Sequence, residues 1–155
     1  MIMIKVQSGP FDVGEEIARL TKDNTSIGGI VSFVGTVREM SDGNAINSMT
    51  LEHYPGMTER ALEEIEAEAN ARWPLEASLI IHRYGKLLPG DGIVLVITAS
   101  AHRKAAFQSA EYLMDWLKSK APFWKLEEDD AGGNWVDARE EDSDATKRWV
   151  SENTD

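Results

Sequence analysis

Two short segments of this chain gather the residue types that bind anions and transfer protons. The first, Ser100-Ala-His-Arg103, carries an imidazole and a guanidinium, and the second, Lys118 to Lys125, carries three ammonium groups. Residues 97–125 hold five Lys and Arg against two Asp and Glu, a local charge of +3 in a chain whose net charge is −11. A small cationic island in an acidic protein indicates a small anionic ligand rather than a nucleic acid.

Lys118 and Lys125 are the candidates for proton transfer. Helical periodicity places Lys118 at the edge of an apolar face, beside Phe107 and Met114. An ammonium group that is partly buried there can act in catalysis, whereas a lysine that only extends over apolar surface is structural. Pro122 turns the chain after the helix, so Lys125 can return toward Lys118. One amine can then serve as a base or nucleophile while the other binds an anion.

Three further cationic residues extend this candidate site. Arg38 follows an apolar strand and offers a forked donor suited to phosphate or carboxylate, although an isolated arginine is more often a surface residue. His102 and Lys118 are sixteen positions apart in the sequence, and a straight helix separates such positions by roughly 24 Å. They therefore serve different sites, or a dimer brings His102 and Arg103 of one chain to Lys118 of the other.

Several reaction classes are excluded by the residues present. The chain has no cysteine, which excludes disulfides, thiolate metal sites and a cysteine nucleophile. Its three histidines lack the spacing of metal ligands, and His53 and His82 lie in apolar strand contexts that are typical of structural residues. Dinucleotide-binding, Walker and nucleophile-elbow motifs are also missing. We therefore expect neither a metal nor a cofactor.

The length and composition are those of one ordinary domain, and we expect residues 1–155 to form a single unit. No apolar run approaches the ~18–20 residues of a membrane span, and no signal peptide is visible. With the absence of cysteine, this favours a cytoplasmic protein that binds neither membrane nor nucleic acid. Residues 126–155 carry a charge of −8, which is either a solvated surface or an electrostatic rim for a basic partner.

The elements that position these residues follow from periodicity and turn signals. Helices are predicted from about Asp12 to Lys22 behind a capping-box-like start, and over Met57–Arg72, Arg103–Ala121 and Asp142–Val150. Strands are predicted at Met1–Gln7, Ile27–Val37, Ser48–Tyr54, Ala77–Tyr84, Gly92–Ala99, Phe123–Glu127 and Asn134–Ala138. Met40–Asn47 has the composition of a flexible loop. This order of elements predicts an α+β domain.

Six motifs occur in order along the chain. They are Ser32-Phe-Val-Gly-Thr-Val-Arg38, Leu51-Glu-His-Tyr-Pro-Gly-Met57, His82-Arg83, Pro89-Gly-Asp91, Ser100-Ala-His-Arg103 and Lys118-Ser-Lys-Ala-Pro-Phe-Trp-Lys125. This ordered set resembles the large, catalytic subunit of molybdopterin synthase. The resemblance covers about residues 4 to 150, and the ordered set is specific although no single motif is decisive.

The resemblance implies an α/β hammerhead fold with an added antiparallel β subdomain, and a sulfurtransferase of molybdenum cofactor biosynthesis. In that family, sulfur arrives as a thiocarboxylate on the C-terminal glycine of a small ubiquitin-like subunit. It is transferred to cyclic pyranopterin monophosphate, which becomes the dithiolene of molybdopterin. Two large subunits form a central dimer within a heterotetramer. A chain without cysteine cannot store the sulfur, and a phosphate-ester substrate accounts for a cationic pocket.

The resemblance also assigns the family's substrate-binding pattern to positions on several predicted elements. These are Thr36, Val37, Arg38, His102, Arg103, Lys118, Lys125, Leu126, Glu127 and Arg139. On this assignment Lys118 is the general acid/base or activates the thiocarboxylate, and Lys125 positions the pterin or supports Lys118. Arg38, His102 and Arg103 bind the phosphate, and the last two act across a subunit interface.

Three alternatives stay open at this stage. Leu126 stands where many relatives are expected to carry a polar or basic residue, so this position acts through its backbone or substrate affinity is reduced. The chain could instead be a non-catalytic binding module for a ubiquitin-like tail, which needs a groove but not paired lysines. A different phosphate-ester enzyme, such as a cyclic phosphodiesterase, would act without any sulfur donor.

Overall fold

The computed structural model describes the whole chain except residues 42, 131, 137–144, 148 and 150–155. Its larger sheet contains, in order, β1 (Ile2–Gln7), β6 (Leu75–Arg83), β8 (Gly92–Ser100) and β2 (Gly29–Thr36). β1 runs parallel to β6, whereas the β6–β8 and β8–β2 pairs are antiparallel. β2 is therefore an edge strand, which begins beside the end of β8 and ends beside its start.

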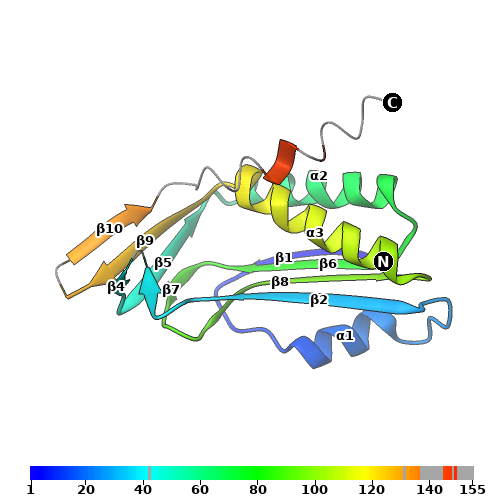
Figure 1. The fold of residues 1–155 in the computed structure, drawn as a ribbon, viewed down its shortest axis with the longest axis horizontal. Helices are drawn as coiled ribbons and strands as arrows, with labels where there is room; N and C mark the ends of the chain where they lie inside the picture. The colour runs from blue at the N-terminus through cyan, green and yellow to red at the C-terminus, as the bar shows by residue number, and fades with distance from the viewer. Residues whose placement is uncertain (42, 131, 137–144, 148, 150–155) are drawn as a thin grey trace.

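Helices cover both faces of this sheet. α2 (Met57–Arg72) and α3 (Arg103–Lys120) lie on one face, and α1 (Val13–Thr21) lies on the other (Figure 1). Successive side chains of β6 and β8 point to opposite faces, so each strand contributes to two cores. Ile80 and Val96 pack with the two-helix face, while Leu79 and Leu95 pack on the side of α1. No described helix combines the length and apolar character that a membrane crossing requires.

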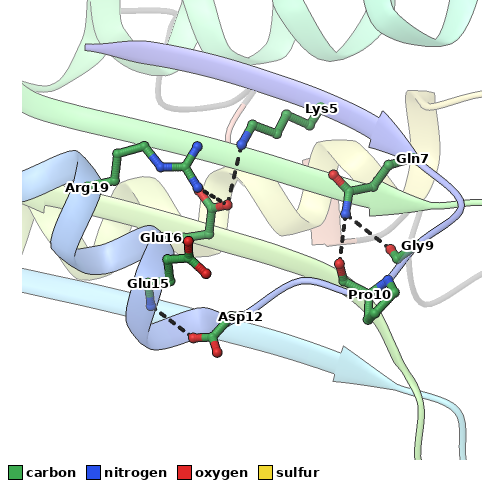
Figure 2. Close-up of polar contacts among 8 residues, drawn as sticks. All are labelled: Lys5, Gln7, Gly9, Pro10, Asp12, Glu15, Glu16 and Arg19. Carbon is green, nitrogen blue, oxygen red and sulfur yellow. Dashed lines mark hydrogen bonds and ion pairs between the residues drawn. The ribbon is translucent and has the colours of Figure 1, made fainter.

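The first helix begins where the sequence predicts. The Asp12 side chain accepts a hydrogen bond from the Glu15 amide at 2.9 Å, which caps the N-terminus of α1 (Figure 2). The buried Glu16 on the same helix pairs with Lys5 of β1 at 3.3 Å and with Arg19 at 2.6 Å. The Lys5–Glu16 pair therefore joins α1 to β1, at the opposite edge of the sheet from β2.

A second, antiparallel sheet extends from one end of the first (Figure 1). Its order is β10 (Gly132–Val136), β9 (Phe123–Asp129), β5 (Ser48–His53) and β7 (Gly85–Leu87). Its core is formed by buried apolar residues from β5, β7 and the segments that join the sheets, namely Val37, Ile46, Met49, Leu51 and Leu87. The predicted α+β architecture with an added antiparallel β subdomain is thereby confirmed.

Some local predictions differ from the structure. The segment Met40–Asn47, predicted as a loop, contains a short hairpin of β3 (Met40–Ser41) and β4 (Asn44–Ala45), with Gly43 at a φ of 82° in its turn. β7 is not predicted, because three residues are too few to show periodicity. β10 spans Gly132–Val136 rather than Asn134–Ala138, whose last two residues lie outside the described part. Of the predicted last helix, residues 145–147 and 149 are helical and the others are not described.

Candidate active site

Lys118 and Lys125 lie on either side of the connection between α3 and β9. Lys118 is exposed in the last turn of α3, and Lys125 is half-buried in β9. The hydroxyl of Thr58, in the first turn of α2, donates to the Pro122 carbonyl at 3.3 Å and so anchors this connection. Figure 1 shows that α3 ends near the junction between the two sheets, so the lysine pair belongs to that junction.

The imidazole of His82, near the end of β6, lies close to both lysines. Its ring is 5% exposed and stacks on Phe123, with ring centroids 3.6 Å apart and an interplanar angle of 16°. Burial, followed by the positive charges of Lys118 and Lys125, lowers the pKa of His82 to about 3, although its hydrogen bond with the Arg83 carbonyl acts in the opposite direction. Both amines therefore lie within electrostatic range of one uncharged ring.

That hydrogen bond also fixes the tautomer of His82. The Nδ1 atom lies 2.8 Å from the Arg83 carbonyl oxygen, and because a carbonyl only accepts, Nδ1 carries the proton. The neutral ring keeps Nε2 as an acceptor. His53 extends the cluster, since its ring centroid is 4.3 Å from that of Tyr84 and 6.3 Å from that of Phe123. Rings from both sheets thus form one cluster around Phe123.

The alternation of β9 separates the residues that follow Lys125. Lys125 and Glu127 pair with Leu51 and Met49 of β5, on the face that carries the core of the second sheet, and Glu127 is buried there. Leu126 lies between them in the strand and points to the opposite face. Glu127 therefore shares a face with Lys125, whereas Leu126 can contribute to that face only through its backbone.

The end of β2 lies at the same end of the large sheet as the last turn of α3. β2 and α3 both run opposite to β8, so both end near the start of β8 (Figure 1). The buried Val37 donates its amide to the Asp91 carbonyl at 2.9 Å and accepts from the Gly90 amide at 2.8 Å. Its neighbours Thr36 and Arg38 are exposed. The buried, hydrogen-bonded Val37 thus fixes the backbone at a point where the side chains on either side of it are exposed to solvent.

His102 and Arg103 occupy the opposite end of α3. His102 precedes the helix, Arg103 is its first residue, and both are exposed. The backbone at Gly28 lies against the backbone just before this helix, because a Cβ on Gly28 would be 2.1 Å from the Ala101 carbonyl oxygen. α3 has 18 residues, and a helix of this length spans about 27 Å. A single chain therefore keeps these two residues far from Lys118.

Arg139, the remaining candidate, lies outside the described residues. Among the residues that the structure does describe, no group of three or more His, Cys, Asp and Glu could hold a metal ion. What one chain brings together is a cationic site. It contains the lysine pair, the neutral His82 ring and, at the same end of the sheet, the exposed Arg38.

Comparison with known proteins identifies the family of this chain. Residues 6–120 match the family model described as MoaE protein. The chain belongs to the MoaE family. A relative from Ralstonia nicotianae, named molybdopterin synthase catalytic subunit, is 53% identical over 149 residues, which are 96% of this chain and 85% of the relative.

Solved structures of the MoaE family show the same fold. The molybdopterin biosynthesis MoaE protein from Burkholderia ambifaria is 50% identical, with a TM-score of 0.83 over 97% of this chain and 99% of that chain. Molybdopterin synthase from Staphylococcus aureus is 33% identical, with a TM-score of 0.79 over 86% of this chain and 96% of that chain. The match thus extends over both sheets.

The structure departs from the sequence prediction at one position of this MoaE-family chain and decides an open alternative at another. Phe107, predicted on the core face of α3 beside Lys118, is 61% exposed. The cause is the position of β2 at the sheet edge, where no described strand lies beyond it. Of the two alternatives left open for Lys118, partial burial and a lysine that extends over the surface, the exposed one is observed. His82, predicted to be a structural residue, is buried and hydrogen-bonded, and the positive charges of both lysines act on it. The spacing of residues in the sequence does not reveal this position of His82, because its contact with Phe123 joins distant parts of the sequence.

Proposed function

We propose that this chain is the catalytic subunit of a molybdopterin synthase. It transfers sulfur from the thiocarboxylated C-terminus of a small ubiquitin-like subunit to cyclic pyranopterin monophosphate, and so forms the dithiolene of molybdopterin. Membership of the MoaE family supports this reaction, and the placement of Lys118 and Lys125 around one neutral ring is the observation that carries it. The chain has no cysteine to hold the sulfur, which accords with an external carrier in the cytoplasm.

The proposed roles follow from exposure and strand geometry. Lys118 is the general acid/base, since its exposed position at a helix end allows its amine to reach a ligand. Lys125 orients the anionic thiocarboxylate or the pterin from its half-buried position in β9. Arg38 and Thr36 contact the phosphate, and Val37 serves by holding them, because its amide and carbonyl already bond within the chain. Glu127 and the backbone of Leu126 complete the lysine face.

A second copy of the chain is proposed to pair along β2. Within the described residues, β2 pairs only with β8, so its outer side is an unprotected sheet edge. The exposed apolar residues of this region come from β2 and from the facing part of α3, namely Ile30, Phe33, Val34 and Phe107. An apolar edge of this kind is typical of a protein interface.

Antiparallel pairing of two β2 strands would complete the phosphate site. A two-fold axis through the strand pair sets the start of one β2 beside the end of the other. Gly29, at the start of β2, adjoins Arg103, since a Cβ on Gly29 would lie 3.4 Å from the Arg103 Cα. His102 and Arg103 of one copy would thus lie near Arg38 and Lys118 of the second copy. This dimer, with one small subunit on each copy, forms the proposed heterotetramer.

The reaction is tested by reconstitution. The protein is mixed with cyclic pyranopterin monophosphate and the thiocarboxylated small subunit, and molybdopterin is detected as its oxidised fluorescent derivative. Lys118→Ala should abolish turnover without unfolding the protein, whereas Lys120→Ala, in the same helical turn, should remain active. Product formation without the thiocarboxylate, or near-normal activity of Lys118→Ala, would refute the assignment. Binding of the small subunit without turnover would favour the tail-binding module.

The site across the interface is tested by complementation. Lys118→Ala and Arg103→Ala are each inactive as homodimers on this proposal. In a mixed dimer, one of the two sites contains both intact residues if Arg103 acts across the interface, so turnover should reappear. If Arg103 and Lys118 act within one chain, every site in the mixed dimer lacks one of them and activity stays absent. Lys118→Ala mixed with Lys118→Ala;Arg103→Ala is the inactive control in either case.

A further inference from the structure

The ring contact between His82 and Phe123 joins the two sheets at the lysine pair. His82 belongs to β6 of the large sheet and Phe123 is the first residue of β9 in the second sheet. The centroid distance of 3.6 Å and interplanar angle of 16° describe a close parallel stack. Phe123 lies between Lys118 and Lys125 in the sequence, so the stack fixes the chain at a point between the two amines.

We propose that His82 is a positioning residue for the lysine pair, acting through its stack on Phe123. The inference rests on the proposed function, because it assigns a role toward the reacting amines of that site. Phe123 and Lys125 share one face of β9, so a shift of the Phe123 ring moves the Lys125 side chain with it. The residue before Phe123 is held as well, because the Thr58 hydroxyl of α2 donates a hydrogen bond to the Pro122 carbonyl at 3.3 Å. The start of β9 is thereby held from α2 and from β6.

The chemistry of the position favours a neutral imidazole. The titratable groups that act on His82 are Lys118 from α3, Lys125 from β9 and His53 from β5, and burial is the largest cause that keeps the ring uncharged. A third positive charge here would repel both amines. The hydrogen bond from Nδ1 to the Arg83 carbonyl at 2.8 Å holds the ring in the plane that stacks on Phe123. The ring therefore orients its neighbours without adding charge.

Two substitutions separate the ring from the hydrogen bond. His82→Phe keeps an aromatic ring and loses the donor, so it should lower the thermal midpoint and should lower kcat less than His82→Gln does. His82→Gln keeps an amide donor and loses the ring, so kcat should fall roughly 10- to 100-fold with KM for both substrates unchanged. A purely structural role predicts that kcat follows the thermal midpoint in both variants, and that result would overturn the proposal.

A double-mutant cycle tests whether the two rings act as one unit. Phe123→Leu should lower kcat about as much as His82→Gln, and the double variant should be no worse than either single variant. Trp124→Leu is the matched control, because Trp124 lies on the opposite face of β9. Its ring centroid is 4.3 Å from that of Tyr54. The effects of Trp124→Leu and His82→Gln should be additive. Additive effects of Phe123→Leu and His82→Gln would contradict the proposal.

Nuclear magnetic resonance tests the position of His82 without relying on turnover. In protein labelled with 15N-histidine, the His82 resonances should show a neutral ring with its proton on Nδ1 throughout the neutral pH range. In protein labelled with 13C-lysine, the Lys125 side-chain signals should move further in His82→Gln than in His82→Phe. A proton on Nε2, or unmoved Lys125 signals, would refute positioning by His82. Absence of turnover in the unchanged protein would refute the proposed function instead.

Discussion

At the scale of single residues, the two lysines differ both in position and in depth of burial. Lys118 is exposed at a helix end, where its long side chain can follow a ligand, while Lys125 is half-buried in a strand and paired with Leu51 of β5. The ring on which both charges act is neutral, because burial lowers the pKa of His82 to about 3. An arriving phosphate or thiocarboxylate is therefore attracted by two ammonium groups with different freedom of movement.

Arginine substitutions should distinguish the roles of these lysines. Arginine keeps the positive charge but does not give up its proton, so it can replace a charge that orients and cannot replace an acid/base. Lys118→Arg is expected to lose roughly 100-fold or more in kcat, whereas Lys125→Arg should retain measurable turnover with a raised KM. Steady-state kinetics in the reconstituted assay give both values, with Lys120→Arg as the control. Full activity of Lys118→Arg would exclude its role in proton transfer.

At the scale of elements, the direction of α3 and the edge position of β2 decide which residues meet. α3 runs back along the large sheet, so its first and last turns lie at opposite ends (Figure 1). His102 and Lys118 are therefore separated by the length of the helix, as their spacing predicts. The exposed apolar side chains of β2 and Phe107 lie on the surface over which the proposed second copy would close this distance.

A charge at the centre of the β2 edge should separate the copies. Val34→Lys places an ammonium group in the proposed strand pair, where it would lose its hydration, so we expect monomers by light scattering. Turnover should fall with dimer content, because each site then lacks His102 and Arg103. The matched control is Met57→Lys, which changes a more exposed apolar residue at the start of α2, away from β2. An active Val34→Lys monomer would contradict a site shared between copies.

At the scale of the whole molecule, the sequence predicts what depends on local pattern and misses what depends on distant contacts. The four strands of the large sheet and its three helices follow from apolar periodicity and from signals such as Asp12 and Pro122. The return of Lys125 toward Lys118 is likewise predicted by the proline turn. The stack of His82 on Phe123 is not, because nothing local in β6 indicates that β9 will lie against it. The strand β7 is missed for the same reason, because it forms by pairing with β5, which is distant in the sequence.

A buried carboxyl group outside the site gives the whole molecule a pH dependence. Glu66 of α2 is fully buried, and burial, in part offset by the Ser78 side chain, raises its pKa from 4.5 to about 8. The folded protein therefore binds a proton at this group between the two values, while the unfolded chain releases it. The stabilising contribution of the protonated group is fully present below pH 4.5 and is lost as the pH rises toward 8.

Replacing Glu66 by its neutral isostere should remove this dependence. Each unit of pKa difference corresponds to about 1.4 kcal/mol, so the free energy of unfolding of the unchanged protein should fall relative to that of Glu66→Gln as the pH rises from 5 to 8. Urea denaturation across that range measures both proteins. Glu63→Gln, at an exposed position of the same helix, should follow the unchanged protein. Because Glu66 lies in α2, away from the lysine pair, the variant should also keep its turnover. Parallel curves for the unchanged protein and Glu66→Gln would mean that Glu66 is ionised in the folded state, and that α2 or β6 opens to hydrate it.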